Sequence, residues 1–203
     1  VKTHPLPKRV LYRYPWDVIG LGREAIRHDI LSNRMDDAKV LDNSVAIVGD
    51  EPVEVHATAT IWPNVVFDAT DGPIQVHDHA VIRPNTTICG PASIGAHCVI
   101  TDRSLIKSGT AMGPWCKIGG EVGGTIIQGY SNKSHDGHLG DSWLGKWVNL
   151  GAGTTNSNLL NTYGEVVVRL DPDGPRHRSG LQFLGSIIGD HVKTAINTRL
   201  MTG

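Results

Sequence analysis

The sequence predicts an all-β fold, a parallel β-helix of hexapeptide repeats, preceded by a helical segment. Two observations on residues 76–118 predict the repeats. Every sixth residue is a large aliphatic side chain or Met: Val76, Ile82, Ile88, Ile94, Ile100, Ile106, Met112 and Ile118. The residue four positions after each of the first seven is small: Ala80, Thr86, Ala92, Cys98, Ser104, Thr110 and Cys116. A period of six fits neither a helix nor a lone strand, and is typical of a solenoid.

Three hexads should form one triangular coil, and coils should stack about 4.8 Å apart. The large residues then fill the interior, and the small ones lie at corners. Hexads begin at Val55 and Ile61, and a turn-rich segment, residues 68–73, resets their phase. We expect the solenoid domain to span residues 51–203.

Residues 1–50 are expected to form a connector that contains a helix. Its first ten residues resemble a loop or tail. A helix should begin near Pro15 and reach about Leu31, because apolar side chains such as Ile19, Ile26 and Ile30 recur at helical spacing.

The composition excludes several functional classes. The formal net charge is -1, so no nucleic-acid or membrane-surface partner is expected. No apolar run reaches the ~18 residues of a membrane span, and no signal peptide opens the chain. Cys89, Cys98 and Cys116 are expected to be reduced, packed thiols of a cytoplasmic protein.

The hexad pattern breaks after Ile118. Residues 119–124 are rich in Gly, and Lys133 stands where an inward aliphatic side chain is due. Lys is rarely buried without a partner, so residues 130–138 should form a modified wall. A second departure, residues 160–184, is expected to be a hairpin with strands at 164–170 and 178–184 and a turn at 171–174. The solenoid should restart at Ile188.

The modified wall resembles a known family. Residues His135, Leu139-Gly140-Asp141, Gly145, Asn149, Leu150-Gly151-Ala152-Gly153-Thr154 and Asn158 match, without a gap, the acetyltransferase half of bifunctional glucosamine-1-phosphate acetyltransferase/uridylyltransferases. The resemblance implies a left-handed β-helix, a homotrimer and a role in UDP-N-acetylglucosamine biosynthesis. It also implies acetyl-CoA as co-substrate and an amino-sugar 1-phosphate as acceptor.

The resemblance also implies a role for each residue. His135 would be the general base, since a neutral imidazole can take the proton of an amine. Asn149 and Asn158 would position the substrates. The backbone of Gly151, Ala152 and Gly153 would contact the thioester, whose oxyanion needs N–H donors. The alternative for His135 is an ordinary solvated loop histidine.

The phosphate of the acceptor requires cations. Lys133, Lys117 and Arg103 are the candidates, beside Lys107, Arg176 and Arg178. The family's own cationic ligands do not align with this sequence, and His138 stands where the family has Tyr. No metal is predicted in this chain, because no two His have the five-residue spacing of the hexapeptide-repeat carbonic anhydrases that bind zinc.

Pro15-Trp16-Asp17 resembles the connector that follows a sugar nucleotidyltransferase domain. We therefore expect such a domain, with its Mg²⁺, before residue 1, and further coils after Gly203 that complete the CoA site. Two alternatives remain open. The solenoid could be a non-catalytic trimerisation or regulatory module of that nucleotidyltransferase, or it could acetylate a sugar hydroxyl.

Overall fold

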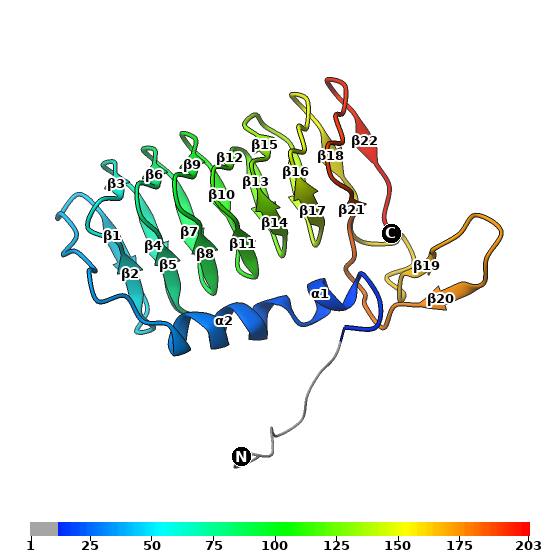
Figure 1. Ribbon diagram of the computed structural model, residues 1–203, viewed down its shortest axis with the longest axis horizontal. Helices are drawn as coiled ribbons and strands as arrows, with labels where there is room; N and C mark the ends of the chain where they lie inside the picture. Colours follow the sequence, from blue (N-terminus) through cyan, green and yellow to red (C-terminus); the bar gives the residue numbers. More distant parts are fainter. Residues whose placement is uncertain (1–11) are drawn as a thin grey trace, which may run out of the picture.

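The computed structural model describes residues 12–203, so the expected N-terminal tail and His4 lie outside the described residues. Within this range the chain winds as a parallel β-solenoid with three sheets (Figure 1). The six-stranded sheet contains β1 (Ala46–Val48), β4 (Val66–Asp68), β7 (Thr87–Cys89), β10 (Leu105–Ile106), β13 (Glu121–Gly123) and β16 (His138–Gly140). The predicted β-helix of hexapeptide repeats is confirmed.

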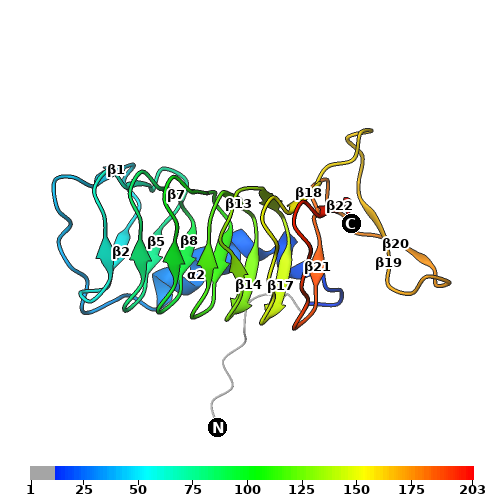
Figure 2. The same cartoon turned by 90° about the horizontal axis from the view of Figure 1, so that it is seen from above.

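The other two sheets complete the triangular coils in the described part of the chain. The seven-stranded sheet contains β2 (Val53–Val55), β5 (Ile74–Val76), β8 (Ala92–Ile94), β11 (Thr110–Met112), β14 (Ile126–Gly129), β17 (Trp143–Lys146) and β21 (Ile187–Ile188). Figure 2 shows strands of this sheet side by side along the solenoid. The five-stranded sheet contains β3 (Thr60–Ile61), β6 (Val81–Ile82), β9 (Val99–Ile100), β12 (Lys117–Ile118) and β15 (Asn132–Lys133).

The hexad residues form the main core. Every sixth residue from Val76 to Ile118 is buried, and so is each of the seven small corner residues. The register explains this, because residues of the same hexad position pair across neighbouring strands, as Ile88 does with Phe67 and Ile106. Each coil thus buries its apolar row against the next, as a solenoid requires.

Two helices precede the coils, where one was expected. They are α1 (Asp17–Gly20) and α2 (Gly22–Ser32), and they lie along the solenoid (Figure 1). Ile26 and Ile30 of α2 are buried, and α2 packs against β8 and β11 of the seven-stranded sheet. Within residues 12–203, no helix is long and apolar enough to cross a bilayer.

The excursion leaves the solenoid after β18 (Thr155–Asn156), which pairs with β22 (Arg199–Leu200). It contains the antiparallel hairpin of β19 (Val167–Arg169) and β20 (Arg176–Arg178). The return strand starts earlier than the predicted 178–184, because a tight turn with a Gly174 N–H to Asp171 C=O bond of 2.9 Å aligns Arg169 with Arg176.

Residues after the hairpin instead help to form a second core. Trp16, Val166 and Leu184 are buried together, and Ile19 and Leu181 pack against them. This second core packs the segment before α1 against the excursion. The two segments are about 150 positions apart in the sequence.

Candidate functional site

Lys133 lies inside the coil, where the hexad pattern requires an aliphatic residue. Only 2% of its surface is exposed. Its ammonium donates to the carbonyl oxygens of Gly119 at 2.8 Å and His135 at 2.9 Å. Burial lowers the pKa of Lys133 to about 8. Lys133 therefore fastens residues 134–137, the loop between β15 and β16, from the inside.

His135 lies on this fastened loop. Its carbonyl faces inward to Lys133, while the residue as a whole is exposed. The carbonyl oxygen of the next residue, Asp136, accepts a hydrogen bond of 3.2 Å from the Gly153 N–H. The loop is thus held through its backbone, and the imidazole of His135 has no hydrogen-bond partner in the described part of the chain.

The Gly151-Ala152-Gly153 turn follows on the next coil. The N–H of Gly151 donates to Thr194 Oγ1 at 2.9 Å, and that of Gly153 to Asp136 as above. The N–H of Ala152 has no acceptor within residues 12–203. Of the three backbone donors suggested by the sequence, Ala152 is therefore the one that remains available to a ligand.

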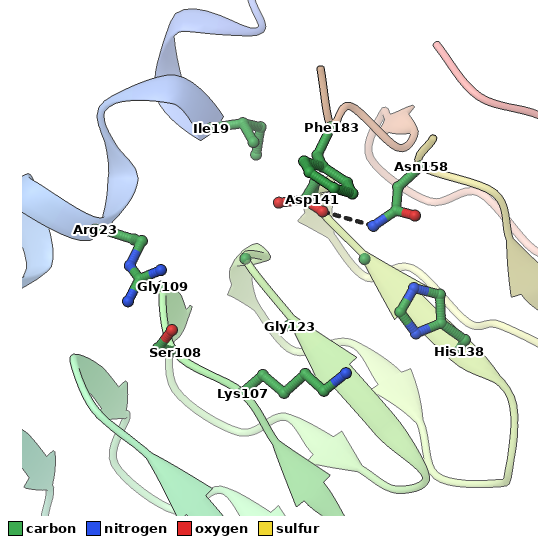
Figure 3. Close-up of a pocket in the computed structure, with 12 residues that line it drawn as sticks. Ile19, Arg23, Lys107, Ser108, Gly109, Gly123, His138, Asp141, Asn158 and Phe183 are labelled. Atoms are coloured by element: carbon green, nitrogen blue, oxygen red, sulfur yellow. Dashed lines mark hydrogen bonds between the residues drawn. The ribbon is translucent and has the colours of Figure 1, made fainter. Parts of the chain in front are cut away.

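A cavity of about 310 Å³ lies at the end of the six-stranded sheet, where the chain turns toward the seven-stranded sheet. We call it the corner cavity (Figure 3). It lies between α1, α2, the coils and the excursion, and its lining includes Ile19, Arg23, Lys107, Ser108, His138, Asp141, Asn158 and Phe183. This volume is at the lower end of the range typical of small-molecule sites.

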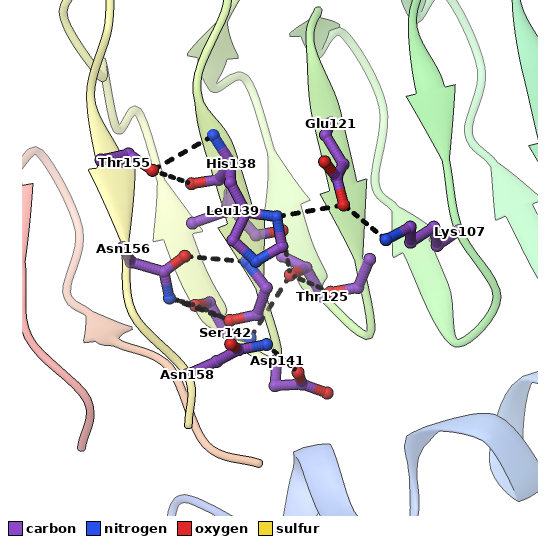
Figure 4. Close-up of polar contacts among 12 residues, drawn as sticks. Lys107, Glu121, Thr125, His138, Leu139, Asp141, Ser142, Thr155, Asn156 and Asn158 are labelled. Atoms are coloured by element: carbon purple, nitrogen blue, oxygen red, sulfur yellow. Dashed lines mark hydrogen bonds and ion pairs between the residues drawn. The ribbon is translucent and has the colours of Figure 1, made fainter. Parts of the chain in front are cut away.

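Polar residues in and beside the corner cavity form two groups (Figure 4). In the first, Glu121 accepts a bond from the Lys107 ammonium and lies 3.3 Å from Nδ1 of His138. The hydrogen bond from Lys107 lowers the pKa of Glu121. In the second, the Asn158 amide donates to Asp141 at 2.6 Å. Burial raises the pKa of Asp141, against the opposing effect of Asn158.

Glycines provide the floor on which these side chains lie. A Cβ at Gly140 would lie 2.5 Å from both Nδ2 of Asn158 and Nε2 of His138. A Cβ at Gly124, where φ is +58°, would lie 2.4 Å from a carboxylate oxygen of Asp141. Because only Gly allows such approaches, the glycines after Ile118 have a clear structural role.

The predicted site residues are only partly brought together. Asn158 lines the corner cavity, whereas His135 and Asn149 do not. Arg103 lines a second hollow of about 370 Å³, which also includes Glu121, Asp136 and Gly137. We call this the loop hollow. His138 lines both spaces, so they adjoin on the outer face of the six-stranded sheet.

Asn149 and Lys117 are exposed on the side of the five-stranded sheet, where Asn149 bridges Asn132 and Lys193. The buried ammonium of Lys133 donates to two backbone carbonyls. Binding of phosphate by Lys133 stays a prediction. Lys107 and Arg23 offer cations to the corner cavity instead.

Sequence reasoning missed Arg23, Asp141 and Phe183 as lining residues of the cavity. Arg23 lies on α2, whose position depends on packing against β8 and β11, and Phe183 lies on an excursion without repeats. Asp141 was noted only as part of a motif. Among residues 12–203, no three His, Cys, Asp or Glu side chains come together as a metal-binding group.

Comparison with known proteins gives several bifunctional proteins as relatives. No family model matches the chain. It is 39% identical over 89 residues to the bifunctional sugar-1-phosphate nucleotidylyltransferase/acetyltransferase of Sulfurisphaera tokodaii, a match that covers 43% of this chain. It is 32% identical over 112 residues, 55% of this chain, to the bifunctional protein GlmU of Methanococcus vannielii.

A longer match extends along most of the chain. The identity to the bifunctional protein GlmU of a Cyanothece species is 27% over 202 residues, which cover 87% of this chain and 39% of the relative. The chain spans only 22% and 25% of the two relatives named first. This chain is therefore a distant homologue of the C-terminal β-solenoid region of bifunctional GlmU-like sugar-1-phosphate nucleotidylyltransferase/acetyltransferases.

Proposed function

We propose that the solenoid transfers an acetyl group from acetyl-CoA to the amine of an amino-sugar 1-phosphate. The observation that carries the proposal is the charge pattern of the corner cavity. Its lining combines the cationic side chains of Arg23 and Lys107 with the imidazole of His138 and the carboxyl group of Asp141. An amino-sugar phosphate has both a phosphate and an ammonium group, so both of its charges find partners in this cavity.

His135 is the general base in this proposal. The neutral amine of the acceptor attacks the thioester carbonyl, a C–N bond forms, and the amine proton passes to the imidazole. The Ala152 N–H stabilises the oxyanion of the tetrahedral intermediate. The C–S bond then breaks, and the CoA thiolate takes the proton from His135.

His138 lines both the corner cavity and the loop hollow. A ligand bound in the corner cavity would therefore lie beside the loop hollow and the His135 loop. Asn158 bonds with the sugar in this arrangement, and Asn149 with the second substrate.

We further propose a homotrimer with the site between protomers. In one chain the His135 residue is exposed, whereas acetyl transfer needs a site from which water is largely excluded. A neighbouring solenoid against the six-stranded sheet would cover the loop. By analogy with the bifunctional relatives, a sugar-1-phosphate nucleotidyltransferase with its own Mg²⁺ would accompany this chain in a cytoplasmic protein.

The test is release of free thiol from acetyl-CoA in the presence of glucosamine 1-phosphate. We compare wild type with His135→Ala and with His28→Ala, a control at another exposed histidine. We expect thiol release by wild type and His28→Ala, and a fall of at least ~100-fold in His135→Ala, the usual range for loss of a general base.

Two outcomes contradict the proposal. Wild-type protein that releases no thiol with any amino-sugar phosphate would favour a non-catalytic trimerisation module. Full activity in His135→Ala would exclude His135 as the base. Stability of the acetylated product to hydroxylamine separates an amide from the ester that O-acetylation would give.

A further inference from the structure

We infer that Arg23 of the helical connector is a specificity-determining residue of the corner cavity, where it binds the phosphate monoester of the acceptor. The connector would thus be part of the acetyl-acceptor site as well as a link to other domains. This inference rests on the proposed function for the identity of the sugar and on the structure for the position of the cation.

Arg23 is placed against the cavity by close packing. A Cβ at Gly109, where φ is +79°, would lie 2.8 Å from Cγ and 3.6 Å from Cδ of Arg23. The aliphatic part of Arg23 therefore lies directly over the Gly109 backbone, in space that any larger residue would fill. Figure 3 shows Arg23 extending from its helix beside Gly109 and Ser108.

The guanidinium of Arg23 has no ion-pair partner in the described part of the chain. Its neighbour on the same helix, Arg27, differs in this respect, since it bonds to Glu51 at 2.7 Å. The other two candidate cations of the cavity, Lys107 and His138, both lie against Glu121. Arg23 is exposed, and its charge acts on the Asp141 carboxylate, whose pKa burial raises and Arg23 lowers. Because Arg23 has no closer acidic partner within residues 12–203, its guanidinium is the one best placed to bind an anion.

The packing of α2 against β8 and β11, together with the second core beside α1, holds Arg23 in this position. Trp16, just before α1, is 2% exposed and packs with Val166 and Leu184 of the excursion. A Cβ at Gly20 would lie 3.1 Å from Leu181 Cδ2, so α1 lies close against the same segment. Ile19 and Phe183, from the two sides of this contact, line the cavity with Arg23.

A phosphate monoester fits this arrangement better than other anions. Arg presents a planar fork that binds two phosphate oxygens at once. The Ser108 hydroxyl on the same lining can donate to a third oxygen. The Asp141 carboxylate disfavours a purely anionic ligand, so an acceptor that also carries an ammonium is favoured.

The experiment measures equilibrium binding by calorimetry for wild type, Arg23→Gln, Arg23→Lys and the control Arg27→Gln. The ligands are glucosamine 1-phosphate, glucosamine and inorganic phosphate. For Arg23→Gln we expect at least ~10-fold weaker binding of glucosamine 1-phosphate and less than ~2-fold change for glucosamine. Arg23→Lys should recover part of the loss, and Arg27→Gln should bind as wild type does.

Each outcome decides the inference separately from the proposed function. A selective loss of the phosphorylated ligand supports Arg23 even if wild type transfers no acetyl group. Unchanged binding in Arg23→Gln, equal losses for glucosamine and its phosphate, or no phosphate-dependent binding by wild type would overturn it. Binding of inorganic phosphate alone, without glucosamine 1-phosphate, would also contradict a sugar-phosphate site.

Discussion

The buried ammonium of Lys133 gives a prediction that can be worked out in detail. Replacing Lys133 by Met keeps the length of the side chain and removes its charge. In the folded protein burial lowers the pKa of Lys133 to about 8, from an ordinary value of 10.5. Because the folded state loses this proton at a lower pH than the unfolded state, wild-type stability rises between about pH 8 and pH 10.5.

The magnitude follows from the same pKa values. At 1.36 kcal/mol for each tenfold change, Lys133 should add about 2.5 kcal/mol to wild-type stability between pH 7 and pH 10. Met cannot titrate, so the variant lacks this gain. At pH 10 the neutral Lys133 amine can donate two hydrogen bonds to carbonyls, worth about 1 kcal/mol each, which Met cannot make. We therefore expect the variant to be about 2 kcal/mol less stable at pH 10. Since wild type loses about 2.5 kcal/mol on going from pH 10 to pH 7 and the variant does not, the two should be nearly equally stable at pH 7.

The assay is urea unfolding of both proteins at pH 7 and pH 10, with thiol release measured at pH 7. Other groups titrate alike in the two proteins, so the difference between them isolates Lys133. Because the variant no longer fastens the His135 loop, we expect kcat to fall by ~10-fold or more while the fold is retained. A stability difference that does not change with pH, or an unchanged kcat, would refute this role of Lys133.

Three further predictions concern the corner cavity and the second core beside it. His138→Ala should raise the KM for glucosamine 1-phosphate by about 10-fold and leave the KM for acetyl-CoA unchanged, as steady-state kinetics would measure; a change in both would contradict the placement of His138. Gly140→Ala should displace the Asn158 and His138 side chains, since its Cβ would lie 2.5 Å from each, and should weaken acceptor binding in calorimetry without altering the circular dichroism of the solenoid. Trp16→Ala should cost about 3–5 kcal/mol locally. In hydrogen exchange it should speed the amides of α1 and the excursion while β8 and β11 stay protected, and uniform deprotection would show that the second core is not separate.

The hexads could be predicted from the sequence because each hexad position has one local packing requirement. A residue such as Ile100 fills the interior, and a residue such as Cys98 fits a corner, whatever the rest of the chain does. Lys133 was informative for the same reason, since it violates that requirement. In the structure its ammonium donates to two backbone carbonyls.

The corner cavity could not be predicted in the same way. Lys107, His138 and Asn158 come from different coils, with the coil of β13 between those of Lys107 and His138, and their meeting depends on coil lengths that vary after Ile118. Arg23 reaches the cavity because α2 packs on the seven-stranded sheet and Trp16 packs on the excursion. That contact has no repeat and no local pattern. Of the matched motif, Asn158 lines the cavity and His135 does not, and the sequence pattern alone did not distinguish the two positions.

The central claim is that His135 serves acetyl transfer to an amine. The most direct measurement is mass spectrometry of the product formed from acetyl-CoA and glucosamine 1-phosphate, with wild type and His135→Ala compared at equal trimer content. The account predicts a hydroxylamine-stable acetylated sugar phosphate with wild type and almost none with the variant. Equal product from both proteins, or none from wild type, would contradict it.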